Sequence, residues 1–87
     1  MKKHIDISLQ GTFSTKRTYR FEVYREASNL RIKGYVQFTS PSEMWIATEG
    51  EEEVVDKFQD WCKRNFSSEE VVMRVVKPGN IMNYNEF

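Results

Sequence analysis

The spacing of apolar residues switches between two periods along the chain, and this alternation restricts the possible folds more than any other feature. Ile5, Ile7 and Leu9 alternate with polar residues, which is the period of a half-buried β-strand. Residues 11–18 have no steady period, and their Gly, Thr and Ser content predicts a loop. From Tyr19 onward the apolar residues are spaced by three or four, which predicts a helix with Thr18 as its N-cap. The predicted apolar face comprises Tyr19, Val23, Ala27 and Leu30.

The rest of the chain continues the same alternation. Two strands are predicted on either side of the turn sequence TSPSE, the first containing Ile32, Val36 and Phe38 and the second MWIAT. After Gly50, acidic residues at the start and basic residues at the end of EEEVVDKFQDWCKRNF predict a helix. Its predicted apolar face comprises Val54, Phe58, Trp61, Cys62 and Asn65. A last strand, EVVMRVVK, is expected to stop at Pro78-Gly79.

The predicted order of elements is therefore β-α-β-β-α-β followed by a short tail. This order is that of the ferredoxin-like α+β sandwich, in which two helices cover one face of a four-stranded antiparallel sheet. No repeat, low-complexity segment or linker interrupts residues 1–87, so we expect a single domain.

Charge and composition restrict the possible partners. Thirteen Lys and Arg residues balance thirteen Asp and Glu residues, so no overall field favours nucleic acid or an anionic membrane. The sequence has no long apolar run, and we expect a cytoplasmic protein. A single cysteine, Cys62, and a single histidine, His4, favour structural roles, and no metal or other cofactor is expected.

Three cations, Lys16, Arg17 and Arg20, gather where the first strand gives way to the first helix. Backbone N–H groups at a helix N-terminus, together with a nearby guanidinium, can bind a phosphate or another small anion. The simpler interpretation is that these cations are solvated side chains on a surface loop.

The sequence resembles the acylphosphatase family, whose members hydrolyse the carboxyl-phosphate bond of acyl phosphates. Tyr19-Arg20 is similar to the Phe-Arg that ends the family's phosphate-binding loop, and Gly34-Tyr35-Val36 is similar to its Gly-Trp-Val. Glu49-Gly50 and the later aromatic residues follow the same register, up to the closing Tyr84-x-x-Phe87. The resemblance implies the ferredoxin-like fold and makes Arg20 the phosphate clamp. Arg17 takes that role if the loop insertion lies later.

Two positions depart from the family pattern. The loop from Gly11 to Arg20 is one residue longer and lacks two of the three family glycines. Phe38 stands where the resemblance implies the Asn that positions the attacking water. The anion-binding loop implied by the resemblance consists of Ser14, Thr15, Lys16, Arg17, Thr18 and Tyr19.

Because a phenyl ring cannot hold water by a hydrogen bond, we expect an anion-binding domain whose acyl-phosphate hydrolysis is lost or much reduced. An active acylphosphatase is the alternative. The expected ligand is an acyl phosphate, phosphate or similar small anion, and the protein is expected to be a monomer or weak homodimer. Aromatic residues on the central hairpin leave RNA binding or a protein interface as less favoured interpretations.

Overall fold

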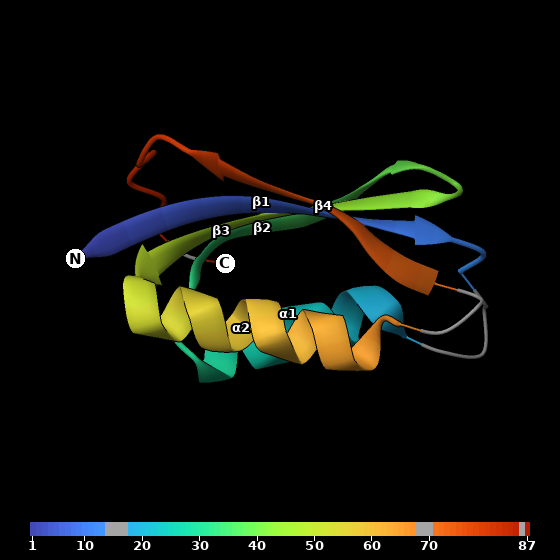
Figure 1. Ribbon diagram of the computed structural model, residues 1–87, viewed down its shortest axis with the longest axis horizontal. Helices are drawn as coiled ribbons and strands as arrows, with labels where there is room; N and C mark the ends of the chain where they lie inside the picture. Colours follow the sequence, from blue (N-terminus) through green and yellow to red (C-terminus); the bar gives the residue numbers. More distant parts are fainter. Residues whose placement is uncertain (14–17, 68–70, 86) are drawn as a thin grey trace.

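The computed structural model describes residues 1–13, 18–67, 71–85 and 87, and for residues 74–76 it describes the backbone alone. In chain order the elements are β1 (Lys2–Gly11), α1 (Tyr19–Asn29), β2 (Lys33–Ser40), β3 (Glu43–Glu51), α2 (Glu52–Asn65) and β4 (Val71–Gly79) (Figure 1). This order confirms the β-α-β-β-α-β arrangement expected from the sequence, including the short turn at Pro41 and Ser42.

The four strands form one antiparallel sheet in the order β2-β3-β1-β4. Ile7 of β1 pairs with Ile46 of β3, which pairs in turn with Val36 of β2. These three side chains are buried on the same face, as the period of two predicts. The sheet therefore has one apolar face and one face with mostly polar side chains.

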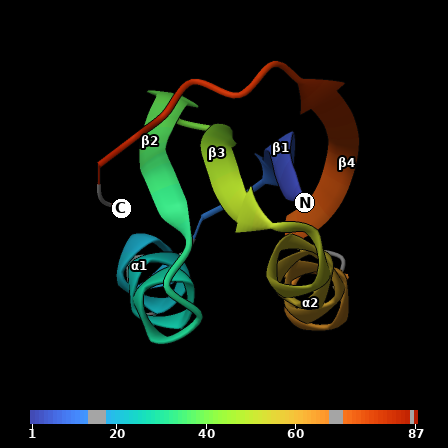
Figure 2. The ribbon, with the colours of Figure 1, turned by 90° about the vertical axis from the view of Figure 1, so that its left-hand side faces the viewer.

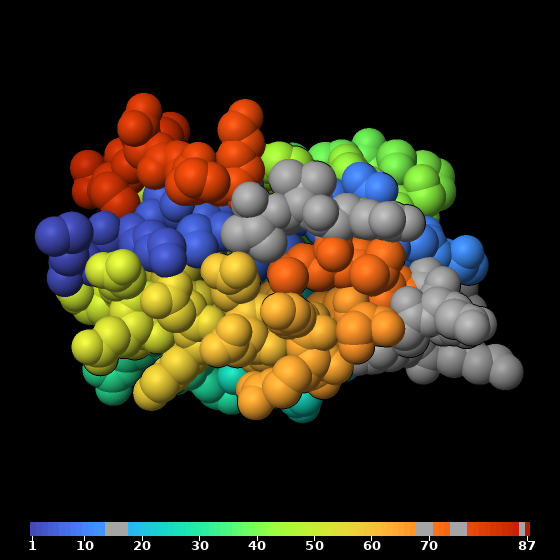
Figure 3. All heavy atoms as spheres, in the orientation of Figure 1, coloured from blue at the N-terminus to red at the C-terminus, as the bar shows by residue number. Residues whose placement is uncertain are grey.

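Both helices pack on the apolar face, with α1 beneath β2 and α2 toward β1 and β4 (Figure 2). Val23 and Ala27 of α1 and Phe58 and Cys62 of α2 are fully buried between the layers. The outer face of α2 lies on the molecular surface, and the C-terminal segment lies on the opposite side of the sheet (Figure 3). The edge of the sheet at β2 is thus bordered by α1 on one side and by the C-terminal segment on the other.

The predicted face of the second helix was wrong at one position. Asn65 is exposed, and its side-chain amide donates a 2.8 Å hydrogen bond to the carbonyl of Trp61. Val55 is buried instead, while Val54 and Trp61 are partly buried. The buried stripe therefore follows Val55, Phe58 and Cys62, with α2 rotated slightly from the predicted face.

The last strand also differs from its predicted end. β4 continues through Pro78 and Gly79, which pair with Ile5 and His4 of β1. Proline has no N–H to donate, which would leave a neighbouring strand without a hydrogen bond on either side of an interior strand, but β4 is an edge strand with a neighbour on one side only. The strand can therefore extend past the residue expected to end it.

Gly34 begins the inward-facing positions of β2 and has a backbone φ of +137°. A Cβ atom at this position would lie 1.9 Å from the carbonyl oxygen of Ala47 on β3. Since no side chain fits this contact, the close approach of β2 to β3 requires glycine here.

None of the helices formed by the described residues is long and apolar enough to span a membrane.

Candidate anion pocket

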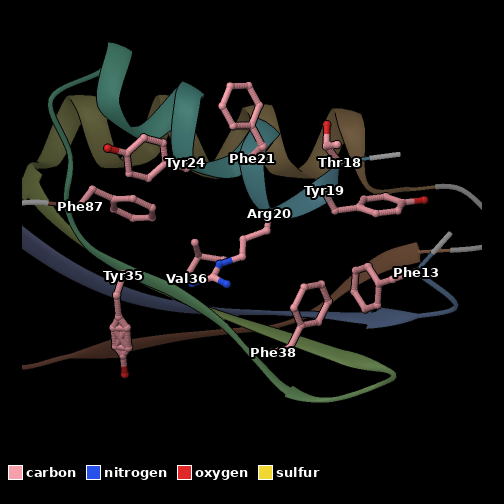
Figure 4. Close-up of a pocket in the computed structure, with 10 residues that line it drawn as sticks. All are labelled: Phe13, Thr18, Tyr19, Arg20, Phe21, Tyr24, Tyr35, Val36, Phe38 and Phe87. Atoms are coloured by element: carbon pink, nitrogen blue, oxygen red, sulfur yellow. The ribbon is translucent and has the colours of Figure 1, made fainter. Parts of the chain in front are cut away.

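A pocket of about 740 Å³ lies between α1 and β2 (Figure 4). Its walls come from three parts of the chain: the junction of the first loop with α1, the strand β2, and the C-terminal residue Phe87. The lining residues are Phe13, Thr18, Tyr19, Arg20, Phe21, Tyr24, Tyr35, Val36, Phe38 and Phe87. Most of these side chains are aromatic, so the pocket suits a ligand with an apolar part.

Among the described residues that line this pocket, Arg20 is the one with a positive charge. Its neighbours along the helix, Tyr19 and Val23, are buried in the core, which directs Arg20 and Tyr24 to the side of α1 next to β2. The guanidinium extends from α1 toward β2, beside Val36 (Figure 4). Among the described residues it forms no hydrogen bond or ion pair. The guanidinium can therefore bind a carboxylate or phosphate in the pocket.

Phe38 and Phe13 form the aromatic end of the pocket. The Phe38 ring meets that of Phe13 edge to face, with the ring centroids 5.1 Å apart. Phe13 makes the same kind of contact with the buried Tyr19, also at 5.1 Å. Phe38 remains 45% exposed, so a small molecule in the pocket can touch it. The side chain at this position offers an apolar surface and no hydrogen bond.

A family comparison connects these residues with a known fold family. The acylphosphatase family model matches residues 15–87. The chain belongs to the acylphosphatase family. The match begins inside the first loop, so β1 and Gly11, which resemble the family pattern, lie outside the matched residues. Arg20 and Phe38 both fall within it.

Solved structures agree on the fold. The structure is similar to full-length HypF in its phosphate- and nucleotide-bound form, with a TM-score of 0.79 and 22% identity. The match covers 100% of this chain but 11% of HypF, so the chain spans about a tenth of that protein. It is also similar to the acylphosphatase of Bacillus subtilis, with a TM-score of 0.76, 18% identity, and coverage of 100% of this chain and 96% of that one. No curated protein matches the sequence.

The structure places the residues that the sequence singled out in different ways. Arg20 and Phe38, which are far apart in sequence, line the same pocket. Four residues of the predicted loop lie outside the described residues: Ser14, Thr15, Lys16 and Arg17. The structure therefore does not test whether Arg17 or Arg20 is the clamp.

The other two loop residues have specific local roles. Thr18 occupies the N-cap position, but its side chain makes no capping hydrogen bond, which differs from the prediction. Its φ of −92° and ψ of 66° lie outside the extended region typical of an N-cap, so its hydroxyl is not held over the first helical N–H groups. That hydroxyl points away from Arg20 (Figure 4). Tyr19 is 3% exposed and packs in the core.

Sequence reasoning missed most of the aromatic wall. Phe21 and Tyr24 flank Arg20 on α1, and both are substantially exposed at 57% and 48%. Phe87 lies beside Tyr24, with ring centroids 6.2 Å apart. The sequence shows that Arg20 and Tyr24 are one helical turn apart and so share a helix face. It does not indicate that Phe87, at the end of the chain, lies beside that face.

Two titratable residues with possible chemistry lie elsewhere. Cys62 is fully buried in α2, and burial, with a smaller contribution from Glu26, raises the pKa of its thiol. His4 is buried on the outer face of the sheet, where its ring lies against Asp6 and Glu49. The described residues contain no cluster of three or more His, Cys, Asp or Glu side chains suited to a metal ion.

Proposed function

We propose that residues 1–87 form one acylphosphatase-like domain that binds a small organic anion and hydrolyses acyl phosphates poorly or not at all. The observation that carries this proposal is the position of Arg20. Its guanidinium, which has no partner within the described residues, enters a pocket whose other walls are largely aromatic, and the side chain at the far end is Phe38. A cytoplasmic location and a monomeric or weakly dimeric state remain predictions from the sequence.

The physical support for binding is the combination of the Arg20 cation with the apolar walls that the described residues form. A carboxylate or phosphate can accept two parallel hydrogen bonds from a guanidinium, and the positive end of the α1 dipole lies nearby. The apolar part of the same ligand would cover exposed aromatic surface of the pocket such as that of Tyr24, which is 48% exposed. That the related HypF structure holds phosphate is consistent with an anion ligand for this family.

The physical argument against efficient hydrolysis concerns the water molecule. Hydrolysis of an acyl phosphate needs water aligned behind phosphorus, opposite the leaving carboxylate. Phe38 has no group that could hold this water, and the neighbouring Gln37 is exposed and, by the alternation of the strand, points to the other face. Loss of one preorganised hydrogen bond commonly costs about a hundredfold to a thousandfold in rate.

A titration followed by two-dimensional amide NMR tests the proposal. Phenyl phosphate combines an anion with an aromatic ring and is stable, while inorganic phosphate and phenol carry the two parts separately. We expect phenyl phosphate to bind at least about tenfold more tightly than either part, with shifts at residues of α1 and β2. Arg20→Ala should weaken its binding by about tenfold to a hundredfold.

Arg64→Ala is the matched control, because Arg64 is an exposed arginine in the last turn of α2, away from the pocket. It should bind phenyl phosphate as the wild type does. Equal affinity of the wild type and Arg20→Ala would refute the proposal, as would shifts confined to surfaces away from the pocket.

A second candidate, an active acylphosphatase, is favoured by family membership and by a guanidinium at the start of α1 that no described residue neutralises. In that case Arg20 would stabilise the charge on the phosphoryl oxygens, and a group other than Phe38 would orient water. Measurement of turnover separates the two candidates.

A further inference from the structure

After β4, residues 80–85 and 87 form no helix or strand, yet they follow a defined course. From Gly79 it crosses the sheet face that the helices leave uncovered and passes over β2 (Figures 1 and 2). It ends at Phe87, on the same side of the molecule as α1 (Figure 2). We call residues 80–85 and 87 the strap. Its path connects the outer face of the sheet with the Arg20 pocket.

A buried carboxylate holds the middle of the strap. Glu49 of β3 is 3% exposed, and its Oε1 accepts a 3.1 Å hydrogen bond from the backbone N–H of Tyr84. Its Oε2 accepts a hydrogen bond from the backbone N–H of Met82 and lies 3.3 Å from Nδ1 of His4. Burying a carboxylate costs free energy unless several hydrogen-bond donors surround it. The strap N–H groups supply such donors to Glu49, and Glu49 supplies the acceptor that these N–H groups need.

The backbone of the strap is shaped for this contact. Asn83, between the two donors, has a φ of +58°, a left-handed conformation that asparagine adopts more readily than most residues. Successive N–H groups around such a residue form a concave site for an anion. Here the anion is the Glu49 side chain, so the turn is fixed by an internal partner.

Aromatic contacts fix the strap on either side of this turn. The Tyr84 ring lies 6.1 Å from that of His4 and meets Tyr35 edge to face at 5.8 Å. The Tyr35 ring points away from the pocket toward this outer face (Figure 4). Three residues later, Phe87 packs against the hydrophobic core and beside Tyr24, where it becomes a wall of the pocket.

We propose that the strap completes the Arg20 pocket, that Phe87 makes the pocket selective for anions carrying a planar aromatic ring, and that Glu49 is the positioning residue that holds Phe87 in place. The inference rests on the proposed anion-binding function and specifies its ligand class: an aryl carboxylate or aryl phosphate. The anionic group lies at Arg20 and the ring lies against Tyr24 and Phe87, where edge or offset contacts between rings are favourable.

The test compares two probes, phenyl phosphate and propyl phosphate, in the wild type and its variants. The wild type should prefer phenyl phosphate by about tenfold or more, and Phe87→Ala should remove most of that preference while leaving propyl phosphate binding within about twofold. Glu49→Gln should lose the same preference. It should also speed hydrogen exchange at the amides of Met82 and Tyr84, a change that a general loss of stability would not confine to the strap.

Glu43→Gln is the matched control for Glu49→Gln. Glu43 is on the same strand and face and accepts hydrogen bonds from Ser8, Gln10 and Thr39, but it does not contact the strap. It should retain both the aromatic preference and the strap protection. Arg20→Ala should weaken both probes.

The outcomes separate the strap from the proposed function. If Arg20→Ala weakens binding but Phe87→Ala and Glu49→Gln keep the wild-type preference, the strap inference is wrong and the anion pocket stands. If the wild type binds neither probe, both are wrong. If Glu49→Gln loses the preference while its strap amides stay protected, Glu49 does not act through the strap.

Discussion

Arg20 and Phe38 line one pocket but have opposite implications for acyl-phosphate hydrolysis: the first favours it and the second disfavours it. Arg20 retains the cation that an acyl-phosphate site needs, and within the described residues nothing neutralises it. Phe38 offers only an apolar ring at the position where the resemblance implies an amide. At the scale of single residues, this contrast is the basis of our proposal that the site holds an anion better than it hydrolyses one.

A single substitution tests this contrast. Phe38→Asn would place a carboxamide in the pocket, and we expect it to raise the rate of benzoyl phosphate hydrolysis by about tenfold to a hundredfold over the wild type. The gain should vanish in the double variant Phe38→Asn with Arg20→Ala. Phe38→Ala is the control for removal of the ring alone. A rate in Phe38→Asn no higher than in Phe38→Ala would show that water positioning is not what the pocket lacks.

At the scale of elements, the strap depends on the ionised form of Glu49. Burial alone would raise the pKa of this carboxyl, but hydrogen bonds from Met82, His4, Tyr84 and Asn83 outweigh it and hold the pKa below its usual value. A group with a lowered folded-state pKa stabilises the protein above its unfolded pKa, near 4.5. This contribution is lost as pH falls through the lower pKa of the folded state.

Glu49→Gln should therefore be less stable than the wild type by about 1–3 kcal/mol at pH 7. The difference should shrink as pH falls below about 4.5. Chemical denaturation at a series of pH values measures both quantities. The charged and titratable groups around Glu49 include His4 and Asp6 on β1, Lys33 on β2 and Tyr84 on the strap, and Lys2, Arg31 and Glu51 line the same surface cavity as Glu49.

Asp6→Asn separates the contribution of Glu49 from that of the other carboxylate beside His4. Asp6→Asn is introduced both into the wild type and into Glu49→Gln. The pH-dependent loss of stability caused by Glu49→Gln should persist in this background. A loss that stays constant down to about pH 2.5, well below the usual pKa of a glutamate, would contradict the account of Glu49.

The elements could be predicted from the sequence because burial imposes a period on each of them. Ile5, Ile7 and Leu9 form a strand face for that reason, and Val23 and Ala27 a helix face. The error at Asn65 arose because the other positions at helical spacing matched, and spacing alone does not locate the centre of a buried stripe. Proline ordinarily predicts a strand end, and whether a strand tolerates it depends on which strand lies at the sheet edge, which the sequence does not show.

The site was less accessible to sequence reasoning. The resemblance drew attention to Arg20 and Phe38, and the structure does bring both to one pocket. The strap has no periodic pattern, and its anchor, Glu49, is 33 residues from Met82 along the chain. A contact of this kind depends on the sheet being assembled first, so no local pattern could have indicated Phe87 as a pocket wall.

At the scale of the whole molecule, one core joins the sheet to both helices, and Cys62 reports on it. The thiol is fully buried and its pKa is raised, so a thiol reagent should reach it only when the protein unfolds. In native conditions at about pH 8, near the usual pKa of an exposed thiol, we expect reaction with Ellman's reagent to be at least about a thousandfold slower than in denaturant.

Phe58→Ala provides the comparison. Phe58 is fully buried and stacks on Trp61, with ring centroids 5.8 Å apart, so its truncation should cost about 3–5 kcal/mol. The variant should then react about a hundredfold or more faster than the wild type. Rapid reaction of native wild type would mean that the core opens locally around α2.

The most direct test of the central claim is the hydrolysis of benzoyl phosphate by the folded wild-type protein and by Arg20→Ala, each compared with the uncatalysed rate. The account predicts that the wild type releases benzoate and phosphate less than about a hundredfold faster than the uncatalysed rate, because the pocket lacks the group that positions water, and that Arg20→Ala is no faster than the wild type. An acceleration of about a hundredfold or more by the wild type, lost in Arg20→Ala, would contradict it and establish an active acylphosphatase.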